Sequence, residues 1–281
     1  MATGMKNSKK ILLLTLSFCI SYLTNAQTSI PVDSVKKQIT TTPIVYNKPL
    51  VKRPKPIHTE LSGGIRLNTD GWSFFMDRGK VKTDDERHSD MFHDILLWQF
   101  ELSEKKNPKE YKSTNSNLDP YSGSKPTPFI FGKINNFYAL KLGIGKRKMI
   151  AGKPDPGTVS IHWVYAGGLS VGMLKPYYIK VYNEANPIKY SDNNRDEFLS
   201  QSTIIGAAGF KQGLHEITFI PGLHVKTALH FDFSSNRKTV LAIETGLNAE
   251  IYSQAIPIMA TQNATPYFLD IYASFQFGKR W

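Results

Sequence analysis

The stretch LDIYASFQFGKRW, residues 269–281, decides the fold because its side chains alternate in character. One parity is apolar and carries Leu269, Ile271, Ala273, Phe275, Phe277 and Trp281. The other parity is mostly polar and carries Asp270, Tyr272, Ser274, Gln276 and Gly278. A period of two predicts a β-strand, and this pair of faces favours lipid on one side and a polar lumen on the other.

The same alternation recurs along the chain and predicts further strands. They cover residues 60–67, 72–82, 96–103, 138–145, 159–171, 223–233 and 241–251. Strands in lipid must leave no backbone group unpaired, which only a closed barrel achieves. The prediction is an all-β fold, a single transmembrane, antiparallel, up-and-down β-barrel of about eight strands. A barrel of ten strands is the alternative, because residues 213–220 could form an additional strand or extend a hairpin.

An even strand number places both ends of the barrel on the periplasmic side and sorts the connections between strands. The extracellular connections are then residues 69–71, 105–127, 183–212 and 254–266. The periplasmic connections are residues 83–90, 148–156 and 234–237. The strands at 138–145 and 159–171 are expected to project above the membrane, because apolar alternation continues toward Tyr177, Tyr178 and Tyr182.

The remaining chain divides into two further segments. Residues 1–26 are expected to be a signal peptide, with Lys6, Lys9 and Lys10 before an apolar stretch at 11–20 that is too short to span a bilayer as a helix. Either Met1 or Met5 could be the true start. Residues 27–56, rich in Pro, Thr and Lys, are predicted to be a flexible periplasmic linker, and residues 57–281 the barrel. Cleavage after residue 26 would remove Cys19, the one cysteine, and with it disulfides and thiolate catalysis.

The terminal stretch resembles the assembly signal of bacterial outer-membrane barrels, with Phe275, Phe277 and the final Trp281 as the residues that carry the likeness. The exported portion as a whole resembles small outer-membrane barrels of the OmpA, OmpX and OmpW-like class, without pointing to one family. This resemblance implies a location in the bacterial outer membrane. It also implies contact with outer-membrane lipid and lipopolysaccharide, and recognition by the barrel-assembly machinery.

The chain is basic, with a formal charge of +12, which becomes 12 − 3 = +9 once the three lysines of residues 1–26 are removed. Export argues against nucleic acid as an anionic partner. Lysines gather in the second extracellular connection, where they could contact lipopolysaccharide phosphates. A solvated loop explains them equally well. These lysines are Lys105, Lys106, Lys109, Lys112 and Lys125.

The predicted lumen carries many charged side chains, which indicates either a polar pathway or a salt-bridged plug. The plug is favoured, because side chains can fill an eight-stranded barrel and buried charges must pair. Lys226 and Glu244 are predicted to form an ion pair, directly opposite or diagonal to each other across the turn at 234–237. The predicted lumenal set is Glu60, Arg66, Glu101, Lys141, His162, His224, Lys226, His230, Asp232, Glu244 and Glu250.

Two patterns in the lumen suggest chemistry, and neither is convincing. The run at 168–172 matches the G-x-S-x-G pattern of serine hydrolases, but that pattern needs a strand-to-helix turn and Ser170 falls inside a predicted strand. His224 and His230 are six residues apart on one strand, roughly 20 Å, so they cannot share a metal ion. His162 could approach one of them only if their strands adjoin. We therefore expect no catalytic residue, no metal site and no cofactor.

Aromatic residues near the predicted strand ends and on the outward faces favour a membrane girdle over ordinary packing. They are Trp72, Trp98, Tyr138, Trp163, Tyr165 and Trp281. The expected function is non-enzymatic: a structural or interaction role in the cell envelope, with residues 183–212 and the linker as contact surfaces for envelope proteins. A narrow channel for small or hydrophobic solutes is the alternative, and a lipid-modifying enzyme is less favoured.

Overall fold

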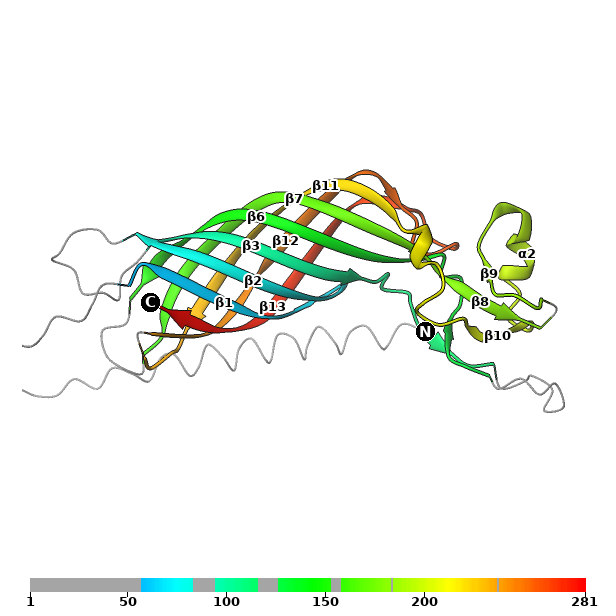
Figure 1. Cartoon of the computed structure of the whole chain (residues 1–281), viewed down its shortest axis with the longest axis horizontal. Coiled ribbons are helices and arrows are strands. Elements are labelled where there is room, and N and C mark those ends of the chain that lie inside the picture. Colours follow the sequence, from blue (N-terminus) through cyan, green and yellow to red (C-terminus); the bar gives the residue numbers. More distant parts are fainter. Residues whose placement is uncertain (1–56, 83–93, 116–125, 153–157, 183, 237) are drawn as a thin grey trace, which may run out of the picture. The chain divides into compact units, whose positions relative to one another are not determined.

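A closed barrel of eight long antiparallel strands dominates the computed structural model (Figure 1). The structure describes residues 57–82, 94–115, 126–152, 158–182, 184–236 and 238–281. These residues lie in one compact unit, Pro54–Trp281. The predicted signal peptide, the predicted linker and the connection at 83–90 lie outside the described residues. The barrel strands are β1 (Thr59–Asn68), β2 (Gly71–Lys82), β3 (Asp94–Lys105), β6 (Asn135–Ala151), β7 (Ser160–Pro176), β11 (Thr218–Asp232), β12 (Thr239–Ile256) and β13 (Thr265–Arg280).

The strands run around the barrel in the order β1-β13-β12-β11-β7-β6-β3-β2, so the first and last strands close the ring. Eight strands rather than ten are confirmed. Leu214–Glu216 form a short 3-10 helix, η3, and the residues after it begin β11, so residues 213–220 extend a hairpin. No helix in the described part of the chain is long and apolar enough to cross a membrane.

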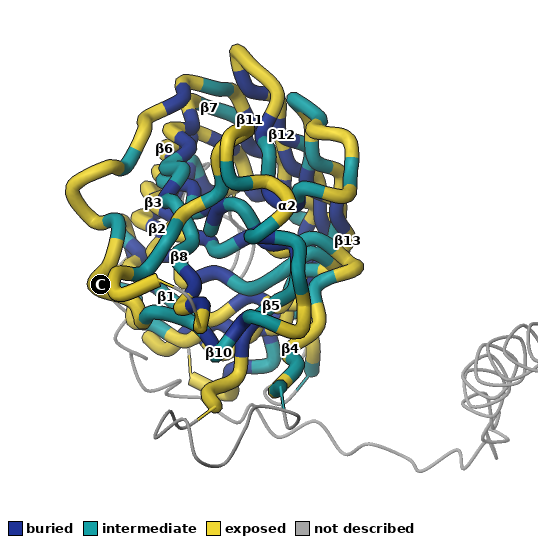
Figure 2. Tube along the Cα trace, turned by 90° about the vertical axis from the view of Figure 1, so that its right-hand side faces the viewer, coloured by how far each residue is buried: buried dark blue, intermediate teal, exposed yellow. Residues whose placement is uncertain are grey.

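The predicted alternation of side chains is confirmed on every barrel strand. On β13, Leu269 is 74% exposed and Phe277 62%, whereas Asp270 and Gln276 are almost fully buried. In the view turned by 90° from Figure 1, buried and exposed positions alternate along the strands (Figure 2). A continuous outer belt of exposed Leu, Ile, Val, Phe and Trp side chains is stable only against lipid, so the barrel spans a membrane.

The two ends of the barrel differ. We call one the inner end: there β1 begins, β13 ends and a short turn joins β11 to β12 (Figure 1). The opposite end is the outer end. At the outer end, β6 and β7, each of 17 residues, exceed the roughly 9–11 residues that span a bilayer, as expected. Past β7 the chain does not continue as the same strand, because β8 belongs to a separate small sheet.

This outer end carries a folded cap. Its three-stranded sheet has the order β10-β8-β9, from β8 (Tyr178–Val181), β9 (Ile188–Lys189) and β10 (Ile204–Ala207). Helices η2 (Asp192–Asn194) and α2 (Arg195–Phe198) follow β9, and β4 (Lys112–Ser113) pairs with β5 (Phe129–Ile130). An apolar core holds the cap together, made of Phe129, Ile179, Val181, Phe198 and Ile204.

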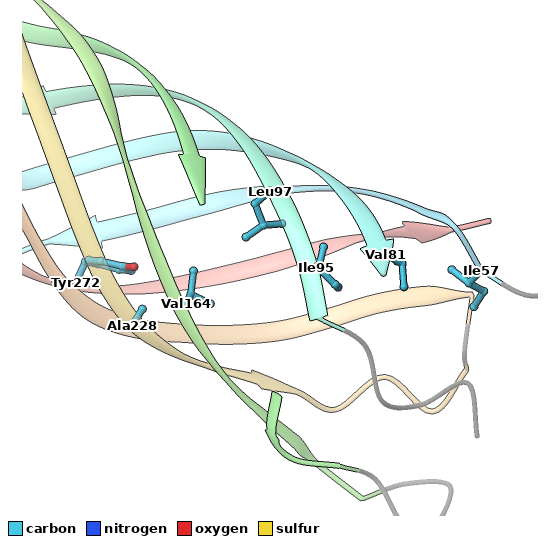
Figure 3. Packing of buried hydrophobic residues seen from close by; sticks show 7 residues of the cluster. All are labelled: Ile57, Val81, Ile95, Leu97, Val164, Ala228 and Tyr272. Carbon is cyan, nitrogen blue, oxygen red and sulfur yellow. The ribbon is translucent and has the colours of Figure 1, made fainter. Parts of the chain in front are cut away.

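Apolar side chains occupy the lumen toward both ends. Toward the inner end, Ile57, Val81 and Ile95 extend a cluster that reaches inward to Tyr272 (Figure 3). Toward the outer end a second cluster consists of Phe137, Ala139, Ile220, Tyr252, Ile256, Ile258 and Met259. Apolar side chains therefore share both ends of the lumen with charged ones, and the alternation along the strands gives no sign of these clusters.

The closing pair of strands, β1 and β13, has a close approach at one glycine. Gly64 faces Gln276, and a Cβ added to Gly64 would lie 1.9 Å from the backbone oxygen of Phe275. A backbone atom of a paired strand cannot move aside without breaking the ladder. Only glycine fits this position of the closed ring.

We predict that Gly64→Ala sharply reduces the yield of folded barrel, measured as the fraction that migrates as the compact, heat-modifiable form in electrophoresis. Gly63→Ala is the matched control, because its added Cβ would meet its nearest atom at 3.1 Å. Equal yields of the two variants would contradict the account of the closing seam.

Candidate functional site

The structure places every member of the predicted lumenal set inside the barrel. Glu60 and His230 are fully buried, and His162, the most exposed of the set, is only 6% exposed. The parity of each strand accounts for this placement, because each of these residues alternates with side chains that face lipid. The functional site is therefore an ordered interior of charges, whose contacts form two chains along the lumen.

The first chain begins near the outer end at Lys105. Its ammonium lies 2.7 Å from Asp70, 2.8 Å from Asp270 and 3.1 Å from Glu250. Glu250 also lies 2.5 Å from Lys141, which in turn lies 3.0 Å from Glu101. Each cation thus bridges carboxylates from different strands.

Glu250 contacts two lysines and also accepts hydrogen bonds from two uncharged side chains. The Tyr252 hydroxyl donates to it at 2.6 Å, and the Asn248 amide donates at 2.8 Å. A buried carboxylate needs several donors to offset its lost hydration. Hydrogen bonds from β12 itself therefore complete the shell that Lys105 and Lys141 begin.

The middle of the lumen is organised around Glu244. Arg66 links it to the first chain, since Arg66 pairs with Glu101 and lies 3.6 Å from Glu244. Glu244 also accepts a hydrogen bond from the Tyr272 hydroxyl at 2.8 Å.

The predicted ion pair between Lys226 and Glu244 is confirmed, with Nζ and Oε1 3.1 Å apart. The predicted register is wrong. Lys226 faces Asn248, and Glu244 faces His230, whose Nδ1 lies 3.3 Å from the carboxylate. The Lys226 and Glu244 side chains extend toward each other, and only together do they cover the four-residue offset along the strands.

The second chain lies toward the inner end. Glu60 lies 2.6 Å from Arg147 and 2.7 Å from Arg280, and Arg280 lies 2.6 Å from Asp232. Because Arg280 stands on β13 and Glu60 on β1, this pairing ties the closing seam together with charge as well as with backbone hydrogen bonds.

Several network members were missing from the predicted set. The parity rule places all of them inward. Three of them, Lys105, Arg147 and Tyr252, lie beyond the predicted strand ends, and the other four lie within predicted strands but were left out of the set. Predicted strands with the correct ends would have included those three residues. The missing members are Asp77, Lys105, Arg147, Tyr252, Asp270, Tyr272 and Arg280.

One of the five predicted lipopolysaccharide lysines must be corrected, and the others stay predictions. Lys105 is not in the loop: it is the last residue of β3 and is fully buried in the lumen. Lys106 is half-exposed and lies 3.7 Å from Glu104, and the Lys109 ammonium donates to Gln262 at 2.9 Å. Lys112 is exposed on β4. Lys125 lies outside the described residues.

The G-x-S-x-G run lies within β7, as expected, and Ser170 is buried in the lumen. His162 and His230 do stand opposite each other on β7 and β11, with ring centroids 5.9 Å apart. His224 faces Gly168, higher on the same pair of strands. Among the described residues, no group of three or more potential ligands could hold a metal ion.

The girdle aromatics face outward. Trp98, Trp163, Tyr165 and Trp281 are among the exposed large side chains. Two of the indole groups have polar partners: Trp72 donates to Glu104 at 2.7 Å and Trp163 to Thr227 at 2.9 Å. An exposed ring with a satisfied polar tip is typical of a membrane boundary.

The predicted contact loop is a structured part of the cap. Within residues 184–212, the Asn194 side chain accepts from the Ser191 backbone at 2.8 Å and donates to the Lys189 carbonyl at 2.8 Å. The Tyr190 ring packs edge-on against Phe198, with centroids 5.5 Å apart. Asn183 lies outside the described residues.

Glu216 of η3 lies outside the barrel and contacts the cap. Hydrogen bonds from Lys189 and Tyr178 lower the pKa of its carboxyl group.

Comparison with known proteins adds likenesses of fold. No protein-family model matches the chain, and no curated protein matches it. Ail of Yersinia pestis, in complex with the heparin analogue sucrose octasulfate, has a TM-score of 0.37 and 9% identity over 81% of this chain and 100% of its own. Neisserial surface protein A has 0.33 and 10%, over 80% and 95%. The outer membrane enzyme PagL has 0.27 and 10%, over 78% and 97%.

These scores are too low to carry an argument about activity, and the assignment rests on the barrel itself. A closed antiparallel barrel with an even number of strands, an apolar exterior and a polar interior is the architecture of bacterial outer-membrane proteins. The chain is an integral outer-membrane β-barrel.

The contacts of Glu244 and Lys226 predict unequal costs for two substitutions. In Glu244→Gln, Lys226 loses the one carboxylate it pairs with among the described residues, which should cost about 3–5 kcal/mol of unfolding free energy. In Lys226→Met, Glu244 keeps Arg66 and Tyr272, so the loss should be smaller.

The measurement is urea unfolding of the refolded barrel in lipid vesicles. Lys189→Met is the control, because its pair with Glu216 is exposed and should contribute only about 0–1 kcal/mol. A Lys226→Met loss as large as that of Glu244→Gln would contradict the account that Glu244 has further partners in the middle of the lumen.

Proposed function

We propose that this protein is a non-enzymatic membrane anchor whose plugged barrel holds a folded cap outside the outer membrane, for contacts with other envelope components. The observation that carries the proposal is the near-zero exposure of the charged lumen. Arg66, Lys141, Glu244 and Glu250 are each 1–2% exposed. A water-filled pathway past these side chains would leave them accessible to solvent.

A narrow channel for small or hydrophobic solutes is the second candidate, and the lumen argues against it. An ion entering the lumen would have to displace carboxylates and ammonium groups that already satisfy one another across strands. The apolar clusters toward both ends add a second barrier, because they favour dry surfaces.

A lipid-modifying enzyme receives less support. Such an enzyme would need its reactive groups on the lipid-facing side of the wall. Ser170, His162 and His224 all face the lumen and are buried.

The cap supports an interaction role because it is a surface with its own apolar core. Phe198, Ile204 and Ile179 are each only 1% exposed, so the cap holds one conformation before any partner arrives. Partners bind such a surface without first ordering it, which lowers the cost of association.

The plugged lumen predicts electrical silence. The mature chain, residues 27–281, refolded into planar bilayers and shown by heat modifiability to be folded, should give no stable openings. A general porin inserted in the same bilayers is the positive control. Reproducible unitary conductance from the folded chain would overturn the anchor and favour the channel.

The cap should unfold locally without the barrel. Phe198→Ala removes a buried ring from the cap core, which typically costs about 3–5 kcal/mol. We expect protease cleavage within residues 184–203 while the barrel stays heat-modifiable. Tyr182→Ala, at a position 56% exposed, is the control. Protease resistance of Phe198→Ala equal to that of the control would show that the cap does not depend on this core.

A further inference from the structure

A cavity of about 500 Å³ lies at the outer end of the barrel, between the wall and the cap. Residues at the outer ends of β3, β6 and β7 form one side of it, and Phe129 of β5 and Phe210 beyond β10 form the other. No local sequence pattern indicates this cavity, because it depends on how the cap packs against the wall.

Lys175 makes this cavity unusual. It shares the outward parity of Leu169 and Val171 on β7, yet it is only 3% exposed because the cap covers it. Its ammonium lies 4.9 Å from the centre of the Phe210 ring. In the described part of the chain it has no ion-pair or hydrogen-bond partner.

The other charges around the cavity do not neutralise this lysine. Four lysines and two glutamates line it, a net 4 − 2 = +2. Lys133 forms an ion pair with Glu110 at 2.7 Å, and Lys106 lies 3.7 Å from Glu104. Lys112 and Lys175 remain without a carboxylate among the described residues. A buried ammonium without a counter-charge is costly, so the cavity is suited to an anion.

The position of the cavity indicates where the anion comes from. On β7 the exposed apolar residues Leu169 and Val171 lead directly up to Lys175. On β6, Leu142 leads through Tyr138 to Asn136, which faces Lys175. An anionic group in the cavity would thus sit at headgroup height, with an apolar wall below it.

We propose that the cavity binds a phosphate group borne by an outer-leaflet lipid, with Lys175 and Lys112 as its cationic contacts. Acyl chains attached to that headgroup would lie against the lipid-facing side chains of β3, β6 and β7. The inference rests on the outer-membrane location and not on the plugged lumen, so a conducting barrel would leave it standing.

The test is native mass spectrometry of the detergent-solubilised mature chain with lipid A, compared with lipid A from which the phosphates have been removed. We expect a lipid A complex that dephosphorylation abolishes. Lys175→Gln should weaken it by roughly tenfold or more, the usual effect of losing a charge-assisted hydrogen bond. Lys175→Arg should keep most of the binding.

Lys146→Gln is the matched control, because Lys146 is an exposed lysine on the same wall toward the inner end. If Lys175→Gln fails to give a heat-modifiable barrel, Lys112→Gln, at an exposed position, takes its place and should weaken binding several-fold. Equal binding of dephosphorylated lipid A, or binding unaffected by both lysine substitutions, would overturn the proposal.

A competition experiment distinguishes a phosphate group on a lipid from free phosphate. Lipid A binding that persists in millimolar inorganic phosphate supports the proposal that the ligand is a lipid. Binding of inorganic phosphate alone that depends on Lys175, without a lipid A complex, would contradict the lipid assignment.

Discussion

Closure of eight strands into a ring creates an interior that side chains must fill, and in this chain many of those side chains are charged. Each buried charge is tolerable only if groups from other strands compensate it. Glu244 and Glu250 meet this condition by collecting cations from several strands together with tyrosine hydroxyls from β12 and β13. The ring and the charge network therefore depend on each other.

The ends of the lumen reinforce this arrangement. Apolar clusters pack beside the charged side chains toward both ends and exclude water from them, which strengthens each ion pair and raises the cost of breaking one. A barrel stabilised in this way is a rigid support. Its outer end carries a cap with its own apolar core, and the space between wall and cap contains a buried lysine at the height of the lipid headgroups.

Strand number, side-chain parity and the pairing of Lys226 with Glu244 were predictable because they follow from a local period of two. Strand ends were not predictable, and wrong ends caused the most serious errors in the predicted lumenal set. Lys105 was placed in a loop, and Arg147 was left out of the lumen. Register was also beyond reach, since the offset between Lys226 and Glu244 depends on the tilt that closes the whole ring. The cap and its cavity arise from contacts between distant loops, for which periodicity gives no signal.

The central claim, a lumen closed to water by its own charges, is tested most directly by thiol accessibility. Ser103 faces the lumen and is 1% exposed. In the chain from residue 27 onward, Ser103→Cys introduces the one thiol, because Cys19 is the one native cysteine. The account predicts that a small charged methanethiosulfonate reagent leaves this thiol unmodified in the folded barrel, while it rapidly modifies Ser253→Cys at an exposed position. Equally fast modification of both would contradict the account.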